Sequence, residues 1–438
     1  MTALRSLVLF WGVWLLVPAI VDGLTTLASL GGVLLLRRRR TRPLTYYPFI
    51  SIVIPVYHRS LATLEACLRS IAAQDYPRNR MEVLLINNDN SHATFAVFVR
   101  LHTTLGLNLF WHAILNQGKS WALNAGIHLS KGQYIFNIDS DTVLAPDAIR
   151  RVVEVMEADR QLGAVTGAIE VLPPAPRAAP ITRLLGECEF FEYLTAFQVG
   201  RTYQTLLQNL YTLSGAFSVF RRDVLLKTFL YNQETVTEDT DLTFALYERM
   251  RGQRIGCVAD AIAYVHPIES LRALYAQRVR WQRGQVEVSA RYRSLMGRSI
   301  FRLRGFAPAR TLLIDHTLAF PRLVWTFLLP ILVLFGYPLA LIVSAIVVLY
   351  LFYVLIDLAW AGVAWLHARP PTRKRLRRIW WLLPVLPLYR MLIFWFRFSG
   401  FLYAVAEPGA WSVQDPLTQA RRGITELRRS VARIAHIH

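Results

Sequence analysis

The sequence predicts an α/β fold, with a mostly parallel sheet, flanked by transmembrane and interfacial helices. Two observations lead to this prediction. Between about residues 50 and 265, strand-like and helix-like runs alternate, as in βαβ units. Apolar residues instead gather at 6–36 and again from about 311 to 404, in stretches long enough to cross a bilayer.

The length and composition of the chain fit an α/β domain combined with membrane segments. The chain has 438 residues, of which 54% are hydrophobic, so it can hold a full catalytic domain and membrane segments. We expect the following parts: an N-terminal transmembrane segment at 1–40, a cytosolic α/β domain at 45–268, interfacial amphipathic helices at 269–310, transmembrane or re-entrant helices at 311–404, and a cytosolic basic tail at 405–438.

The N-terminal stretch 6–36 is apolar apart from Asp22 and a few small polar residues. A secretory signal is the main alternative, but the stretch is too long, its basic flank follows the apolar core, and it has no clear cleavage site. One long tilted helix, or a span plus an interfacial turn, fits better. The run Arg37–Arg40 follows it directly, which predicts that residue 41 onward lies in the cytosol.

The C-terminal apolar region contains two candidate spans, 319–337 and 340–366, followed by a basic run at 369–378 that should return the chain to the cytosol. Residues 379–404 are apolar but carry Arg390 and Arg397, which are costly in a membrane. This piece is therefore either a re-entrant or interfacial helix or a span that faces a polar channel, giving three or four spans in total. The arginine-rich tail 415–438 is typical of a surface amphipathic helix.

The charge and cysteine content exclude several classes. A net charge of +20 is compatible with nucleic acid or with an anionic membrane, but the arginines lie beside the apolar segments and no nucleic-acid module is present, so we expect no nucleic-acid partner. The three cysteines, Cys67, Cys188 and Cys257, include no CxxC pair, which argues against a disulfide framework or a zinc site. We expect them to be buried small hydrophobes.

The α/β region begins with a β-branched run, ISIVIPVY, typical of a buried parallel strand. Further strands and the helices between them follow at regular intervals. Ligands of such sheets bind at the carboxyl ends of the strands, where Asn87-Asn88-Asp89 and Asp139-Ser140-Asp141 fall. The predicted elements are strands 50–57, 82–87, 107–111 and 134–138 and helices 61–73 and 120–130.

Asp139 and Asp141 are candidates for binding a divalent cation. Two carboxylates one residue apart after a buried strand can hold a hard cation while phosphates complete its shell, and the cation would neutralise a leaving diphosphate. The alternative is a turn in which the aspartates only cap and hydrogen-bond. Asp89 could accept hydrogen bonds from a nucleoside, with a polar turn as its alternative.

Three further segments carry possible chemistry. Gly118-Lys119 combines a close-approach glycine with a lysine at a helix start, which suits an anion such as diphosphate; the alternative is an ordinary helix start. Glu238-Asp239 offers a carboxylate as general base or, alternatively, first-turn acids of a capped helix. Gln277 and Trp281 share a helix face beside Arg280, which can clamp diphosphate oxygens. The alternative is a basic amphipathic helix that lies on the membrane.

These motifs occur in one order that resembles the membrane-embedded family-2 glycosyltransferases, which include cellulose, chitin, hyaluronan and poly-N-acetylglucosamine synthases. The resemblance covers roughly residues 50–285, and QxxRW at 277–281 is its most diagnostic motif. The stretches 188–201, 213–222 and 277–285 also resemble bacterial glycosyltransferases associated with exosortase G systems. One departure is Asn88, where family members usually have an aspartate, and this weakens the assignment of uracil.

The resemblance implies a glycosyltransferase-A type domain and a role for each matching residue. Nucleotide-sugar donor binding falls to Pro55, Tyr57, Asp89, Lys119, Asp139, Gln277 and Arg280. The catalytic residues are Asp239, as the base, and Glu238. The metal ion, Mg²⁺ or Mn²⁺, is bound by Asp141 and Asp139. The acceptor is bound by Trp281, Ser214 and Gly215.

The function implied by the resemblance is inverting transfer of a sugar from a nucleotide-sugar, UDP-linked in the family, to a growing polysaccharide exported across the bacterial plasma membrane. With three or four spans, a complete channel would need a homo-oligomer or a partner subunit. One alternative is glycosylation of a membrane lipid, since ceramide glucosyltransferases carry a related RW motif. Another is a scaffold that has lost activity, against which the intact acids and Trp281 argue.

Overall fold

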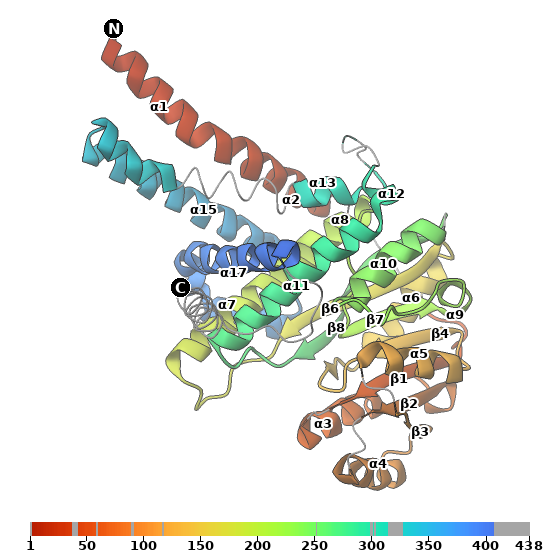
Figure 1. The fold of residues 1–438 in the computed structure, drawn as a ribbon. Coiled ribbons are helices and arrows are strands. Elements are labelled where there is room, and N and C mark those ends of the chain that lie inside the picture. Colours follow the sequence, from red (N-terminus) through yellow and green to blue (C-terminus); the bar gives the residue numbers. More distant parts are fainter. Residues whose placement is uncertain are drawn as a thin grey trace, which may run out of the picture.

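The computed structural model describes residues 2–36, 43–57, 60–88, 92–115, 118–250, 252–297, 301, 304–313 and 327–406. An α/β domain occupies one end of the molecule and long apolar helices the other (Figure 1). The strands are β1 (Ile50–Val56), β2 (Met81–Asn87), β3 (Leu109–Ala113), β4 (Tyr134–Ile138), β5 (Val143–Leu144), β6 (Leu162–Val171), β7 (Phe217–Arg221) and β8 (Arg254–Val265).

The helices of the α/β domain cover the sheet or connect its strands, and the remaining helices belong to the membrane region or link it to the domain. The first group comprises α3 (Leu61–Ala72), α4 (His92–Thr104), α5 (Lys119–Leu129), α6 (Ala148–Ala158), α9 (Arg222–Leu225) and α10 (Glu238–Arg249). The second comprises α1 (Thr2–Pro18), α2 (Leu24–Leu36), α7 (Pro180–Thr195), α8 (Thr202–Leu206), α11 (Leu271–Arg291), α12 (Arg293–Met296), α13 (Pro308–Leu312), α15 (Leu339–His367), α16 (Pro370–Arg378) and α17 (Leu386–Ala406).

The described strands form one eight-stranded sheet in the order β3-β2-β1-β4-β7-β6-β8-β5. Strands β3, β2, β1 and β4 are parallel, as predicted, with Ile50 opposite both Met81 and Tyr134. These strands are buried along their length except at β3, which explains their continuous apolar composition. The predicted strand at 107–111 lies two residues later, at Leu109–Ala113.

The second half of the sheet is mixed. Strand β7 runs antiparallel to β4 and β6, and β5 runs antiparallel to β8, while β6 and β8 are parallel. The mostly parallel sheet is therefore confirmed, with two antiparallel strands that the local sequence did not reveal. Because Phe217 of β7 pairs with Ile138 at the carboxyl end of β4, the residues just before β7 lie over that edge of the sheet.

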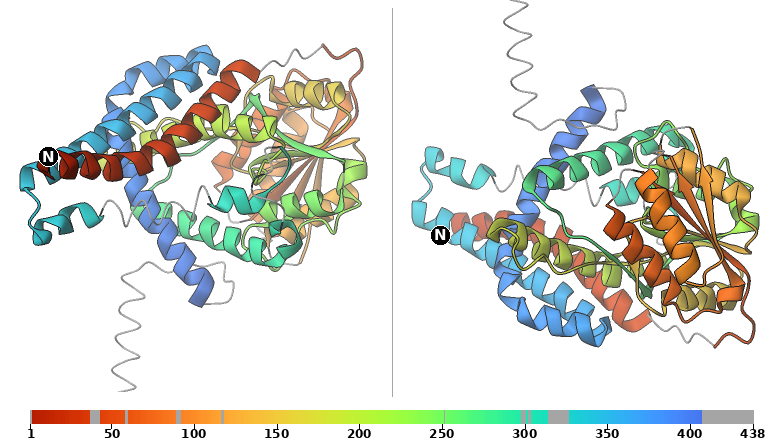
Figure 2. Two further views of the ribbon diagram at one scale, coloured as in Figure 1. Left: turned by 90° about the horizontal axis from the view of Figure 1, so that it is seen from above. Right: turned by 90° about the horizontal axis from the view of Figure 1, so that it is seen from below.

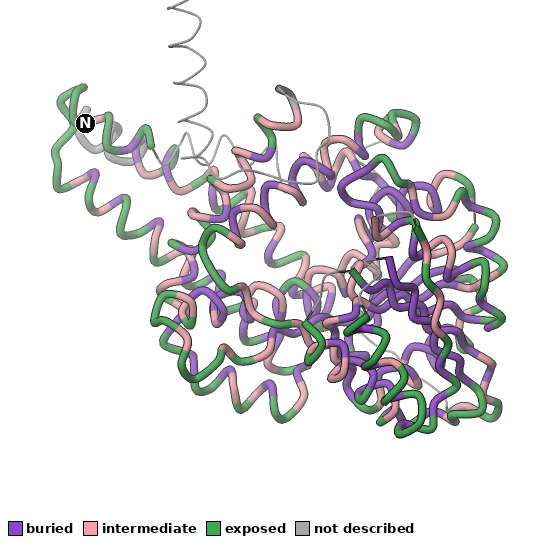
Figure 3. Tube along the Cα trace, turned by 60° about the horizontal axis from the view of Figure 1, so that its bottom comes forward, coloured by how far each residue is buried: buried purple, intermediate pink, exposed green. Residues whose placement is uncertain are grey.

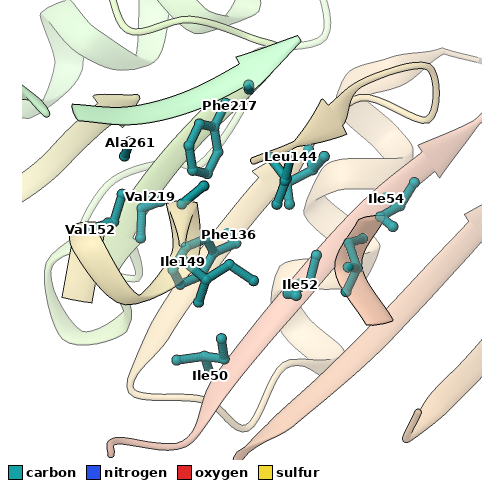
Figure 4. Close-up of a cluster of buried hydrophobic side chains, with 14 of the residues drawn as sticks. Ile50, Ile52, Ile54, Phe136, Leu144, Ile149, Val152, Phe217, Val219 and Ala261 are labelled. Atoms are coloured by element: carbon teal, nitrogen blue, oxygen red, sulfur yellow. The ribbon is translucent and has the colours of Figure 1, made fainter. Parts of the chain in front are cut away.

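The largest core lies between the sheet and helices α3 and α6. Figure 4 shows Ile50, Ile52, Phe136 and Val219 of the sheet facing Ile149 and Val152 of α6. All six are fully buried, and this packing fixes the carboxyl ends of β1 and β4 relative to each other. The three cysteines are free and buried, as expected.

Three helices in the described residues are long and apolar enough to cross a membrane: Phe10–Leu36, Leu339–His367 and Trp380–Ala404. The first is one continuous helical path, with a π-helical turn at Ala19–Gly23 between α1 and α2. Figure 3 shows buried residues concentrated around the sheet, whereas the helices near the N-terminus carry many exposed ones. The first eight residues of the predicted span at 319–337 lie outside the described residues, which resume at 327.

Helices α2 and α15 run in the same direction. Tyr353 donates a hydrogen bond to Asp22 at 2.9 Å, and Trp360 donates one to Thr26 at 3.2 Å, so the pairing advances along both helices together. Both helices therefore end at the same side of the molecule, where the sequence continues into Arg37–Arg40 and into the basic run after residue 368.

The two arginines of the last apolar segment both have protein partners. Arg390 of α17 forms an ion pair with the fully buried Asp357 of α15, and Arg397 donates to Gln282 of α11 at 3.0 Å. Helix α17 crosses α11 closely, with Gly400 against the Val279 backbone, as Figures 1 and 2 show. The cost of placing these cations in an apolar helix is thereby offset by ionic and polar contacts.

Part of the basic run lies against the α/β domain. In α16 and the residue before it, Arg369 pairs with Asp147 at 2.8 Å and Arg375 with Glu187 at 2.8 Å, while Thr372 donates to the buried Glu170 at 2.9 Å. The α/β domain therefore lies on the same side as the basic ends of α2 and α15.

Candidate active site

Lys119 lies at the centre of an acidic cluster at the carboxyl edge of the sheet. Its Nζ is 2.6 Å from Asp139 Oδ1, at the end of β4, and 3.3 Å from Glu238 Oε1, in the first turn of α10. The side chains of Lys119 and Asp139 are each 24% exposed, and the side chain of Glu238 is 9% exposed. Three of the predicted site residues are thus brought together by a single ammonium group.

Gly215 joins this cluster to Asp239. The Gly215 N–H donates to Asp239 Oδ2 at 3.1 Å, and its carbonyl oxygen lies 3.4 Å from Lys119 Nζ. A Cβ at this position would come within 3.1 Å of Lys119 Nζ and 3.4 Å of Asp239 Oδ2, so a side chain here would crowd both groups. The second Asp239 oxygen accepts from the Thr240 N–H at 2.7 Å. Ser214, the other predicted residue of this pair, precedes Gly215 in the same turn and is half-buried.

The charges in this cluster shift two pKa values. Burial, and next the nearby Glu238, raise the pKa of Asp239 to about 6, against the opposing effect of Lys119. Burial by itself would lower the pKa of Lys119, but Asp139 and Glu238 hold it above its usual value. Lys119 therefore stays protonated, while Asp239 exchanges its proton near neutral pH, as a general base must.

The predicted metal residues fit a cation that binds through phosphates. Asp139 and Asp141 both follow the last residue of β4, and both are half-buried. No group of three or more His, Cys, Asp or Glu residues that could hold a metal occurs within the described part of the chain. Mg²⁺ and Mn²⁺ accept one or two carboxylates with substrate phosphates in the remaining positions, so this donor set suits a cation that arrives with a diphosphate.

The nucleoside side of the site involves Asn88 and Gly118. The Asn88 amide donates to the Gly118 carbonyl at 3.1 Å, a bond that the aspartate usual in the family could not donate. Its Oδ1 is buried with no hydrogen-bond partner among the described residues, and so it can accept from a bound base. Gly118 precedes α5 with φ at 120°, a conformation that favours glycine. Asp89 lies outside the described residues.

The two predicted donor residues of the first strand differ in exposure. Pro55 is buried opposite Ile86 of β2, beyond the last pair between β1 and β4 at Val53 and Asn137. Tyr57 follows the strand and is 43% exposed, at the edge where ligands of parallel sheets bind.

Helix α11 carries the predicted Gln277, Arg280 and Trp281. Gln277 Oε1 and Arg280 Nε are buried without a hydrogen-bond partner in the described structure. Leaving such atoms unpaired costs free energy, which points to a ligand that pairs them. One turn further on, a Cβ on Gly284 would overlap the Thr237 side chain, so α11 packs directly against the start of α10 and fixes its own position relative to Glu238 and Asp239.

A second helix completes the surroundings of Trp281. Its ring lies 6.4 Å from that of Tyr193 in α7, and the guanidinium of Arg278 lies 4.5 Å above it. Arg278 is 5% exposed and pairs with Glu192 at 2.8 Å, and Tyr389 of α17 donates to the same carboxylate at 2.9 Å. Trp281 is thereby held by α7 and, through the shared Glu192, by α17.

The sequence reasoning missed Arg201 and the rings that lead to it. The ring centroids of Tyr193 and Phe197 are 6.2 Å apart. The Arg201 guanidinium carbon lies 4.3 Å from the Phe197 ring centroid, and the guanidinium donates to the Thr212 carbonyl at 3.1 Å. Burial lowers the pKa of Arg201, and nearby groups that include Asp239 oppose this shift. Arg201 therefore interacts electrostatically with the same carboxylate as Lys119 does. The aromatic spacing in FFEYLTAF was the signal available in the sequence. The π-helical turn Ala196–Arg201, which positions Arg201, is visible only in the structure.

Comparison with known proteins identifies related chains. The family described as "Glycosyltransferase like family 2" matches residues 48–284. Poly-beta-1,6-N-acetyl-D-glucosamine synthase of Staphylococcus aureus (strain COL) is 29% identical over 242 residues, covering 55% of this chain and 56% of that protein. Its Staphylococcus epidermidis counterpart is 28% identical with the same coverage. The chain therefore spans about half the length of the curated relatives it matches.

A solved structure shares the fold. Mannosyltransferase PcManGT from Pyrobaculum calidifontis, solved in complex with GDP-Man and Mn²⁺, aligns with a TM-score of 0.56 over 90% of this chain and 97% of that chain, at 19% identity. At this identity the likeness concerns the fold alone.

Proposed function

Because the chain belongs to the glycosyltransferase-like family 2, we propose that it transfers a sugar, with inversion, from a UDP-linked donor to a growing polysaccharide. Membership of the family and its similarity to polysaccharide synthases make it a hexosyltransferase with membrane helices. The donor, the acceptor and the roles of individual residues are the proposal. The observation that supports it best is the cluster of Lys119, Asp139, Glu238 and Asp239 around Gly215.

Asp239 is the general base in this proposal. An acceptor hydroxyl attacks the anomeric carbon, a new carbon–oxygen bond forms, and the bond from that carbon to the diphosphate oxygen breaks. Asp239 Oδ2 takes the hydroxyl proton, and nucleoside diphosphate leaves with the bonding electrons. A pKa of about 6 suits this role at neutral pH, since the carboxylate is then both ionised and basic enough to accept a proton.

The diphosphate lies between two sets of donors. Lys119 exchanges its Asp139 partner for phosphate oxygens, and from α11 the buried Nε of Arg280 donates to the same group. Gln277 donates to it through its side-chain amide N–H, while its buried Oε1, which can only accept, pairs with a hydroxyl of the donor sugar. Asp139 and Asp141 would hold Mg²⁺ or Mn²⁺, which would neutralise charge on the leaving diphosphate. Asn88 Oδ1 accepts a hydrogen bond from the base, with Pro55, Tyr57 and Asp89 completing the donor site.

The acceptor enters along Trp281. The rings of Trp281, Tyr193 and Phe197 form a row that ends at Arg201, near Asp239. Aromatic faces suit the apolar faces of sugar rings, while Ser214, Gly215 and Arg201 offer hydrogen-bonding groups near the base. A polymer chain that slides along this row would present its terminal hydroxyl to Asp239.

The site faces the cytosol of a bacterium in this proposal. Helices α2 and α15 are parallel, both are followed by arginine-rich sequence, and α16 attaches that basic end to the α/β domain. Basic flanks stay on the cytosolic side. We propose the domain ranges expected from the sequence, with the polymer leaving between membrane helices that a second copy or a partner subunit completes.

The test supplies labelled UDP-glucose, UDP-N-acetylglucosamine or GDP-mannose, one at a time, to inverted membrane vesicles with Mg²⁺ or Mn²⁺, and sizes the labelled product. We expect label from a UDP-sugar in high-mass, glycosidase-sensitive material, lost in Asp239→Asn vesicles. Label confined to the organic phase would replace the polymer with a lipid acceptor, and transfer only from GDP-mannose would overturn the UDP assignment.

A further inference from the structure

An apolar groove of about 660 Å³ runs between α2 and α15, away from the site described above. Its walls include Leu30, Gly31 and Leu34 on α2 and Gly362, Trp365 and Leu366 on α15. A Cβ on Gly31 or on Gly362 would meet no atom within 4 Å, so the two glycines leave open space in the groove. Leu34 and Leu366 are each about half exposed, and an apolar chain lying there would cover them.

Cations lie at one end of this groove, where α15 turns into α16. The guanidinium groups of Arg373 and Arg377 lie 5.1 and 5.4 Å from the Trp365 ring centroid. Arg373 also donates to the Leu366 carbonyl at 2.7 Å, and its Nε is buried without a hydrogen-bond partner in the described structure. A stacked guanidinium keeps its N–H edges for oxygen ligands, so both arginines can bind a phosphate above the indole.

Other basic residues of the same run are used differently. Arg369 forms an ion pair with Asp147 of the α/β domain, and Arg375 forms one with Glu187 of α7. No acidic partner of Arg373 or Arg377 occurs within the described residues. Arg373 and Arg377 therefore hold a positive charge at the end of the apolar groove that no described carboxylate compensates, and this combination matches a molecule with an apolar tail and an anionic head.

We propose that this groove binds an anionic phospholipid, with an acyl chain between α2 and α15 and the phosphodiester on Arg373 and Arg377. The groove supplies apolar contact, and the arginines supply charge-assisted hydrogen bonds at the depth where a tryptophan marks the membrane interface. The inference is independent of which sugar the enzyme transfers, because it concerns another surface of the protein.

The experiment measures lipid bound to the full-length protein in detergent by native mass spectrometry, with phosphatidylglycerol or phosphatidylcholine of identical acyl chains. We expect the wild type to retain phosphatidylglycerol roughly tenfold better, since each basic residue at a membrane surface adds severalfold to affinity. The Arg373→Gln/Arg377→Gln variant should lose this preference. The matched control Lys374→Gln/Arg378→Gln, with equal charge removed from exposed positions of α16, should keep it.

Filling the groove gives a second, separate readout. The Gly31→Leu/Gly362→Leu variant places side chains in open space, so it should fold and should lose both lipids together. Equal retention of the two lipids by the wild type would overturn the proposal, as would equal losses in the control variant. Displacement of phosphatidylglycerol by inorganic phosphate alone would indicate an anion site without a lipid tail. A Gly362→Cys variant tests whether two copies meet at the groove. If its copies cross-link to each other to the same extent with and without added lipid, a second copy fills the groove and the proposal is wrong.

Discussion

The carboxyl edge of the sheet and helix α11 both carry predicted donor-binding residues, but their polar groups are arranged in opposite ways. At the sheet edge, Lys119 is paired with Asp139 and Glu238, and Asp239 accepts two backbone N–H groups. On α11, Gln277 Oε1 and Arg280 Nε are buried without partners in the described structure. In the proposed function, donor binding would replace existing contacts at the first region and create new ones at the second.

This difference separates what each region contributes. Contacts that only replace others add little net binding energy, whereas pairing a buried orphan atom recovers its desolvation penalty. We therefore expect α11 to govern donor affinity and the sheet edge to govern turnover.

The largest effect should come from Asp239→Asn, which keeps the size of the side chain but removes the base. We expect kcat to fall by about 10²–10⁴ while donor affinity, measured by calorimetry with nucleoside diphosphate, changes little. The control is Asp241→Asn two residues later in α10, where the carboxylate pairs with Arg291 at 3.1 Å. If Asp239→Asn retained near-wild-type turnover, another group would have to be the base.

The next effect should come from Arg280→Gln on α11. Because a hydrogen bond to a charged group contributes about 1.5–3 kcal/mol, we expect donor affinity to fall roughly 10–100-fold and kcat at saturating donor to change much less. Arg272→Gln, at an exposed position of the same helix, serves as the charge-matched control. A loss of kcat with unchanged affinity would reverse the roles assigned to the two regions.

The pH dependence tests the electrostatics of the sheet edge. Burial and Glu238 raise the pKa of Asp239 to about 6, and the base works only when deprotonated. Activity should therefore be full above this pKa and fall about tenfold per pH unit below it, giving a single acid limb in kcat/KM near pH 6. An acid limb near pH 4, the value of an ordinary carboxyl group, would mean that Asp239 is not the titrating base.

The smallest effect should come from Tyr389→Phe, which removes the hydrogen bond from α17 to Glu192. The partner of Tyr389 is a carboxylate, so this hydrogen bond is worth about 1.5–3 kcal/mol, but Arg278 would keep its ion pair with Glu192 and its position over Trp281. Only a fraction of that free energy therefore reaches Trp281, and we expect acceptor KM to rise about two- to fivefold, with donor affinity unchanged. Equal changes in donor and acceptor KM would mean that α17 supports the whole of α11 rather than Trp281.

The sequence by itself determined the parallel half of the sheet and the order of the motifs. The runs at β1, β2 and β4 are buried on both faces, so their composition reports both strand and burial. It also located the apolar helices, because length and composition decide whether a segment can cross a bilayer. Asn88 is the position where the sequence departs from the family pattern, and the hydrogen bond from its side-chain amide to the Gly118 carbonyl is one that an aspartate could not donate.

Only the tertiary structure decided which of these residues meet. Lys119 and Gly215 are 96 residues apart, and they meet because β7 enters antiparallel to β4. Arg201 and Tyr193 belong to the site because a helix outside the sheet packs beside Trp281, and Arg390 is tolerated in an apolar helix because Asp357 lies on its neighbour. Local sequence encodes local propensity and burial, but contacts between distant residues depend on how the elements pack, which periodicity does not specify.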